Sequence, residues 1–216
     1  MISLFSIQDP GNSIEWMLYL ADKYAGMFWE GTKLTLFIAV LGTILGFALG
    51  YVIGIIQDAK INKGDHILKK ALLRLIKAIV TVYVEIFRDT PMIVQAMIIY
   101  FRIREANIEI DPVSAGVLVT VLNTGAYMAE TVRAGIGSID LGQREGAWAM
   151  GMSPMKTMIC VVLPQAFKNI IPEMANTFLT NLKMTSVRNV SAGQELFMAA
   201  KTVGGNYYKY FESYLG

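Results

Sequence analysis

The sequence has few of the side chains from which disulfide frameworks, metal sites and catalytic triads are built. It contains one cysteine, Cys160, and one histidine, His66, among 216 residues. One cysteine excludes an internal disulfide and a cysteine-rich metal site, and one histidine leaves little for zinc catalysis or a histidine-based triad. Charged residues make up only 17% of the chain, and the net charge is +2. We therefore expect no metal ligands, no catalytic residues and no nucleic-acid partner.

Apolar residues, at 54% of the chain, are in excess, and the mean hydropathy is +0.46. Residues 34–57 form a run of 24 without a charge, which as a helix spans roughly 36 Å and crosses a hydrocarbon core of about 30 Å. A soluble protein with buried helices is the alternative, but most soluble helices are shorter and amphipathic. The pattern favours an all-α membrane protein with membrane helices over residues 34–57, 78–101, 112–133 and 157–182.

The segment before the first membrane helix has a different pattern. Residues 13–29 carry apolar side chains near helical spacing and a charged opposite side, with Trp16, Tyr19, Tyr24 and Trp29 as interfacial aromatics. We predict an amphipathic helix at the membrane surface. The first 15 residues contain no lysine or arginine, which argues against a signal peptide.

Basic residues predict the orientation of the helices. The connection over residues 58–77 holds six lysines and arginines, more than any other connection. The positive-inside rule places this connection, and the third one over residues 130–156, in the cytoplasm and the N-terminus outside.

Glycine recurs at every fourth position of the first membrane helix, at Gly42, Gly46, Gly50 and Gly54. On a helix this spacing makes one smooth ridge that lets another helix approach closely. We interpret the ridge as a packing face, either inside the subunit or between subunits.

The chain shows no nucleotide-binding loop. Residues 26–33 come close to a phosphate-binding loop, but Thr32 and Lys33 stand in the wrong order and a membrane helix follows. By contrast, the polar segment 137–154 carries two short helical pieces, and Gly151 followed by Ser153 and Pro154 predicts a stop and a restart. A connection of this length with helical pieces is more often functional than passive.

This segment resembles a known motif. Glu145-Gly-Ala147, then Gly151 and then Leu163-Pro164 resemble the EAA motif of the permease subunits of ATP-binding-cassette (ABC) importers. Three further stretches resemble the polar amino-acid branch of that family, in family order between residues 29 and 212. They are Arg88–Gln95, with its Thr-Pro-x-x-Val-Gln pattern, Ala126–Ile136, and Asn181–Ser186 with Glu195-Leu196.

The resemblance implies a single transmembrane permease domain over residues 1–216 with the type I, MetI-like core of about five helices. The last helix should begin after Tyr210-Phe211-Glu212, where the chain stops, and we expect truncation. The central alanine of the motif is Gly146 here, which weakens the helix by about 1 kcal/mol. The implied cytoplasmic coupling loop occupies residues 137–154, and its contact residues are Glu145, Gly146, Ala147, Trp148, Met150, Gly151 and Met152.

The resemblance also implies the partners and the location. They are a second permease subunit, identical or a sister chain, a cytoplasmic ATPase dimer that holds ATP and Mg²⁺, an extracytoplasmic substrate-binding protein and membrane lipid. The chain would bind no cofactor and would not itself be an enzyme. It would be a multi-pass protein of the bacterial inner membrane that translocates polar or charged amino acids.

Polar side chains within the membrane helices are candidates for the substrate pathway. They are Thr90, Gln95, Asn123, Thr124, Asn176 and Asn181, with the acids Glu85 and Asp89. The alternative is that these groups only join helices, and Pro91 frees the carbonyl of Phe87 for either role. A permease for another small solute, and a membrane-embedded enzyme using its intramembrane acids, also stay open.

Overall fold

The computed structural model describes residues 12–59, 66–184 and 196–215. The family-like residues Thr185, Ser186 and Glu195 lie outside these ranges. Within them the regular elements are all helices, which confirms the all-α prediction. They are α1 (Ser13–Lys23), α2 (Ala25–Asp58), α3 (Ile67–Asp89), α4 (Met92–Glu105), α5 (Pro112–Gly137), α6 (Leu141–Ala149), α7 (Pro154–Thr157), the π-helical turn η1 (Met158–Val162), α8 (Leu163–Met184), α9 (Leu196–Tyr207) and α10 (Tyr210–Leu215).

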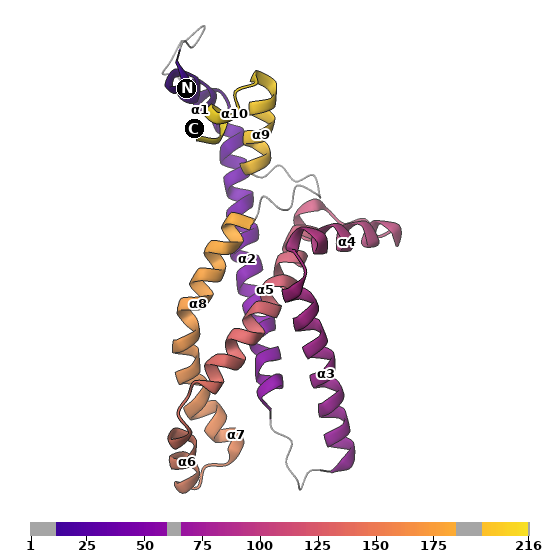
Figure 1. Ribbon diagram of the computed structural model, residues 1–216, viewed down its shortest axis with the longest axis vertical. Coiled ribbons are helices and arrows are strands. Elements are labelled where there is room, and N and C mark those ends of the chain that lie inside the picture. Colours follow the sequence, from indigo (N-terminus) through magenta and orange to yellow (C-terminus); the bar gives the residue numbers. More distant parts are fainter. Residues whose placement is uncertain (1–11, 60–65, 185–195, 216) are drawn as a thin grey trace.

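The helices form an elongated bundle (Figure 1). The helices α1, α9 and α10 lie together at one end, whereas α6, α7, the end of α2 and the start of α3 lie at the other. Of the described helices, α2 and α5 are long and apolar enough to cross a membrane. They contain the predicted spans 34–57 and 112–133.

The helices α2 and α5 pack along the glycine ridge, which forms the centre of the bundle. A Cβ atom added to Gly42 would lie 2.5 Å from Thr120 Cγ2, and one added to Gly54 would lie 2.7 Å from Val132 Cβ. Residue numbers rise together along both helices, so α2 and α5 run parallel. The ridge is therefore a packing face inside the subunit, because only hydrogen fits between the two backbones.

Two predicted helices are interrupted. The predicted surface helix 13–29 ends at Lys23, where Lys23 Nζ donates to the Tyr207 hydroxyl of α9 (2.6 Å) and Tyr24 leaves helical geometry. Residues 25–29 belong instead to α2, in one helix with the first predicted span. The predicted helix 78–101 was also wrong, because Thr90 is extended before Pro91 and the chain turns from α3 into α4 (Figure 1).

The predicted helix 157–182 consists of the end of α7, η1 and α8. The Leu163 N–H donates to the carbonyl of Met158, five residues back. Pro164 has no N–H for the carbonyl of Cys160, so the α-helical pattern cannot continue here. The wider turn separates the segment 137–154 from the regular part of α8.

Candidate functional site

The break between α3 and α4 exposes backbone groups that side chains then occupy. Pro91 lacks the N–H that Phe87 O would accept in a continuous helix. The Gln95 side-chain amide donates to this oxygen at 2.8 Å and to the Thr90 carbonyl at 2.9 Å. The Asn123 amide of α5 donates to Phe87 O at 3.3 Å and to the Gln95 Oε1 at 3.1 Å. The carbonyl freed by proline is thus satisfied within the subunit.

A cavity of about 510 Å³ lies beside this network, between the α3–α4 break, α5 and α8. Five of the predicted pathway residues line it, namely Asp89, Thr90, Asn123, Thr124 and Asn181. The sequence therefore predicted groups that three helices and the α3–α4 break bring into one place.

The other three predicted pathway residues lie elsewhere. Gln95 is buried behind Asn123 and supports the break from within. Asn176 is exposed on α8, where its amide donates to Glu173 Oε2 at 3.4 Å. Glu85 lines a separate cavity of about 320 Å³.

Several residues that line the larger cavity were not predicted from the sequence. The Arg88 guanidinium lies 5.8 Å from the centroid of the Tyr127 ring, and the Tyr127 hydroxyl donates to the Arg88 carbonyl at 3.2 Å. From α8, beside the predicted Asn181, the cavity is lined by Glu173, Thr177, Thr180 and Met184. Their spacing of three and four residues is that of one helical face, so a polar stripe along α8 was the available signal.

Asn181 joins three helices at the wall of the cavity. Its buried amide donates to Thr43 Oγ1 of α2 and to Thr124 Oγ1 of α5, each at 2.9 Å. Such interhelical hydrogen bonds stabilise a membrane bundle by about 0.6 kcal/mol on average. Asn181 and Thr124 therefore hold helices together and also line the cavity.

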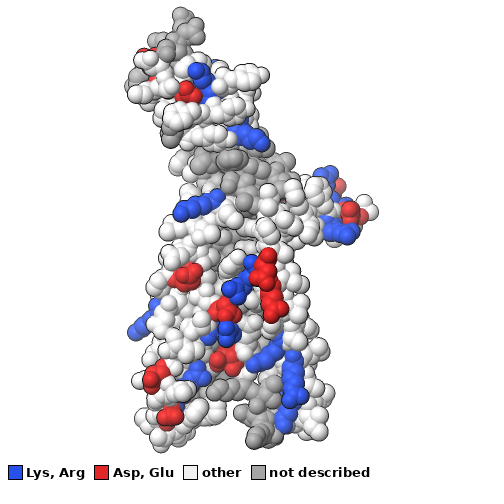
Figure 2. All heavy atoms as spheres, viewed as in Figure 1, with Lys and Arg blue, Asp and Glu red and all other residues white. Residues whose placement is uncertain are grey.

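Charged side chains continue from the cavity along the face between α3 and α5 (Figure 2). Arg88 lines both the larger cavity and the smaller one that contains Glu85. In the smaller cavity Glu130 and Arg133 of α5 form an ion pair, and Lys77 Nζ donates to the Gln57 carbonyl at 2.8 Å. Charges of both signs thus follow one face toward the end that carries α6 and α7.

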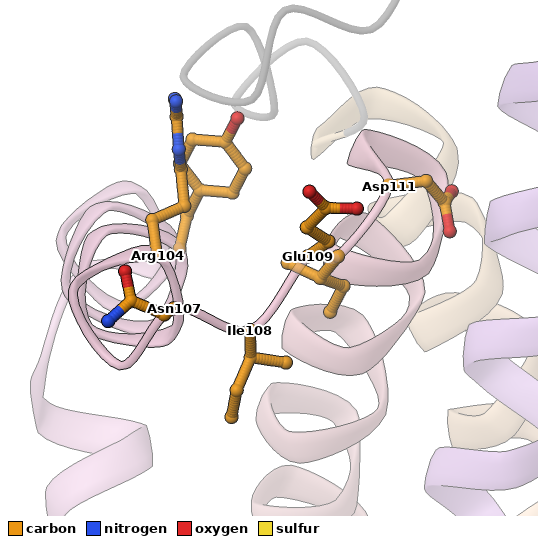
Figure 3. A pocket seen from close by; sticks show the side chains of 7 residues that line it. Arg104, Asn107, Ile108, Glu109 and Asp111 are labelled. Carbon is orange, nitrogen blue, oxygen red and sulfur yellow. The ribbon is translucent and has the colours of Figure 1, made fainter.

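A third hollow, of about 790 Å³, lies at the turn between α4 and α5. Arg104 and Glu109 stand on opposite sides of it, and Asp111 points away toward α5 (Figure 3). Hydrogen bonds from Ser114 hold the pKa of the Asp111 carboxyl below its ordinary value. The bond from the Ser114 side chain contributes most, and the bond from its backbone N–H contributes next. Asp111 is the N-cap of α5, and its carboxylate accepts from the Ser114 N–H. The residues that line this hollow include none of the predicted pathway residues.

The segment 137–154 contains the predicted stop and restart. Gly151 has a positive φ of 79°, which favours glycine. The Ser153 hydroxyl accepts from the Lys156 N–H at 3.4 Å, and Pro154 occupies the first turn of α7, as predicted.

The predicted coupling residues differ in exposure. Ala147 is buried, whereas Glu145, Gly146, Trp148, Met150 and Gly151 are exposed and Met152 is half-buried. Trp148 and Met150 are 46% and 84% exposed. The segment therefore presents large apolar side chains at the end of the molecule opposite the chain termini (Figure 1).

This bundle, with a polar cavity inside and an exposed helical segment at one end, is the architecture of a membrane transport subunit. Residues 69–202 match the family described as "Binding-protein-dependent transport system inner membrane component", and the chain belongs to this family. It is accordingly a multi-pass component of the inner membrane.

Individual relatives agree with this assignment. The chain is 34% identical to a putative glutamine transport system permease protein, GlnP, of Rickettsia prowazekii, over 90% of this chain and 85% of that protein. It is 33% identical to the L-cystine transport system permease protein TcyB of Bacillus subtilis, over 90% and 77%. A solved amino acid ABC transporter with histidines matches 89% of this chain and 85% of its own, with a TM-score of 0.78 and 33% identity.

Proposed function

We propose that this chain is the translocating subunit of an ABC importer and that the cavity between the α3–α4 break, α5 and α8 is part of the path of a polar amino acid. The observation that carries the proposal is the convergence of Asp89, Asn123 and Asn181 on one cavity from three helices. An amino acid that leaves water needs such groups to replace its hydration, because an unpaired charge in a dry site costs several kcal/mol.

The lining suits both charges of an amino acid. The carboxylates of Asp89 and Glu173 can accept from an ammonium group, and the Arg88 guanidinium can donate to a carboxylate. The relatives named above are described as permease proteins of a glutamine and an L-cystine transport system, the former as putative, and the solved one contains histidines. The shared chemistry supports the class of polar amino acids and leaves the individual substrate open.

The exposed segment around α6 fits the coupling role. Trp148 and Met150 offer apolar side chains for a groove on a cytoplasmic ATPase subunit. The start of α3, which carries Lys69, Lys70 and Arg74, lies at the same end (Figure 1), which supports a cytoplasmic location for that end and an outside N-terminus.

The complete transporter would contain two permease subunits, two ATPase subunits with ATP and Mg²⁺, and an extracytoplasmic binding protein. Closure of the ATPase pair would move the segment 137–154 and switch access to the cavity between the two sides. This chain would supply the path and no cofactor site, and ATP hydrolysis would belong to the partner. A permease for another small solute is the alternative.

The test compares two asparagines in the reconstituted transporter with its binding protein. Asn123→Ala removes a cavity amide, and Asn176→Ala removes an exposed amide outside the cavity. We expect Asn123→Ala to change the concentration dependence or selectivity of uptake across the amino acids, and Asn176→Ala to leave both unchanged. Identical uptake by Asn123→Ala and the parent, with assembly intact, would place the path elsewhere. If the transporter took up another small solute and no amino acid, the alternative of a permease for that solute would be favoured.

A further inference from the structure

A cavity of about 670 Å³ lies between the segment 137–154 and the ends of α2 and α3, separate from the proposed substrate path. Its walls are mainly apolar, formed by Ile55, Trp148, Pro154, Met155, Met158 and Val162. Its charged lining residues are Asp58, Lys69 and Arg144, with a formal sum of +1. A space with an apolar wall and a cationic edge suits an amphiphile with an anionic head.

Arg144 is the unusual member of this lining. It is only 8% exposed, yet within the described residues it donates one hydrogen bond, from Nη2 to the Ile136 carbonyl at 3.1 Å, and its buried Nε has no partner there. Within the described residues, no carboxylate forms an ion pair with it. A buried cation without a counter-charge is destabilising. The guanidinium is therefore suited to an anion from outside the chain.

We propose that this cavity binds the phosphate headgroup of an anionic phospholipid, with the acyl chains along its apolar wall. Arginine binds phosphate through paired N–H donors, and basic cavities between membrane helices at the cytoplasmic side hold anionic headgroups. The cavity lies at the end of α2, a helix long and apolar enough to span the membrane. The proposal does not depend on which solute is transported.

A phospholipid fits the cavity better than a carboxylate of a partner protein. A single acidic side chain would meet Arg144 but would leave most of the apolar wall uncovered. Lys69, exposed at the first turn of α3, adds a second cation at the edge. The carboxylate of Asp58 also lines the cavity and repels an anion. We therefore expect the charge of Asp58 to weaken binding of the anionic headgroup.

The test uses the purified complex of permease and ATPase subunits, incubated with vesicles of phosphatidylcholine that contain or lack phosphatidylglycerol. Native mass spectrometry then counts the phospholipids retained. We expect the parent complex to retain phosphatidylglycerol in preference to phosphatidylcholine. Lys69→Gln should reduce this preference about fivefold, the effect of one basic residue near an anionic surface, and Arg144→Gln by at least as much. Asp58→Asn should increase it.

The control is Arg102→Gln, which removes an exposed arginine of α4 that pairs with Glu105, far from this cavity. It should retain lipid as the parent does. If Arg144→Gln fails to fold, Lys69→Gln and Asp58→Asn decide the question by their opposite signs.

Three results would overturn the proposal. Equal retention of phosphatidylglycerol by the parent, Lys69→Gln and Asp58→Asn would show that the cavity does not select an anionic lipid. Displacement of the lipid by inorganic phosphate at equal concentration would assign the cavity to free phosphate. Loss of the ATPase subunit from Arg144→Gln, with lipid retention unchanged, would assign the guanidinium to a partner carboxylate.

Discussion

Gly46 of α2 lies directly against Thr124 of α5, and a Cβ atom added to Gly46 would lie 2.6 Å from the Thr124 Cβ. The hydroxyl of the same threonine accepts a hydrogen bond from Asn181 of α8 at 2.9 Å. A close approach of the two central helices is therefore directly connected to the wall of the proposed substrate cavity.

The first prediction concerns this helix pair. Gly46→Ala should destabilise the subunit by about 1–3 kcal/mol, because the added methyl group forces α2 and α5 apart. Thermal unfolding of the purified complex measures the effect. The control is Gly26→Ala in the same helix, where an added Cβ meets no atom within 4 Å. An unchanged midpoint for Gly46→Ala would mean that the two backbones are not so close.

The second prediction separates Gln95 from Asn123. Gln95→Ala should lower stability by about 1–3 kcal/mol, because Phe87 O loses its 2.8 Å donor at the proline break. Amino-acid selectivity should stay as in the parent, since Gln95 does not line the cavity. Thermal unfolding and competition uptake test the two parts. The exposed Gln143→Ala serves as the control, and a selectivity change in Gln95→Ala without lost stability would refute the supporting role.

The third prediction concerns coupling. Gly151→Asp should preserve membrane insertion but reduce transport and substrate-stimulated ATP hydrolysis, because a charged side chain is forced into a left-handed turn of the exposed segment. Gly146→Ala is the matched control in the same segment. Its added Cβ meets nothing within 4 Å, so it should stabilise α6 by about 0.5–1 kcal/mol and remain coupled. Normal coupling in assembled Gly151→Asp would count against the assignment of this segment.

The fourth prediction concerns orientation. Single cysteines replace Lys69 and Asn107 in a Cys160→Ala background, which removes the exposed native thiol. An impermeant thiol reagent applied to intact cells should label position 107 and spare position 69, because the basic α2–α3 connection is retained in the cytoplasm. Labelling of position 69 instead would invert the subunit and move the segment 137–154 outside.

Much of the bundle followed from local patterns in the sequence. The uncharged runs predicted α2 and α5, since burial in lipid requires apolar length, and the four glycines predicted a close helix contact. Gly151, Ser153 and Pro154 predicted a turn and a helix start because each residue acts on its own backbone. The same polar residues that suggested a pathway include five that line the cavity.

The tertiary structure decided which polar groups face the same space. Pro91 by itself indicated a freed carbonyl, but only the position of Gln95 beside Phe87 O showed which side chain satisfies it. Glu85 and Asp89 are four residues apart on α3 and yet line different cavities. Composition and periodicity determine which segments of the chain leave water and where those segments form helices. Partners distant in the chain determine whether a polar group lines a cavity or joins two helices, because that depends on how whole helices pack.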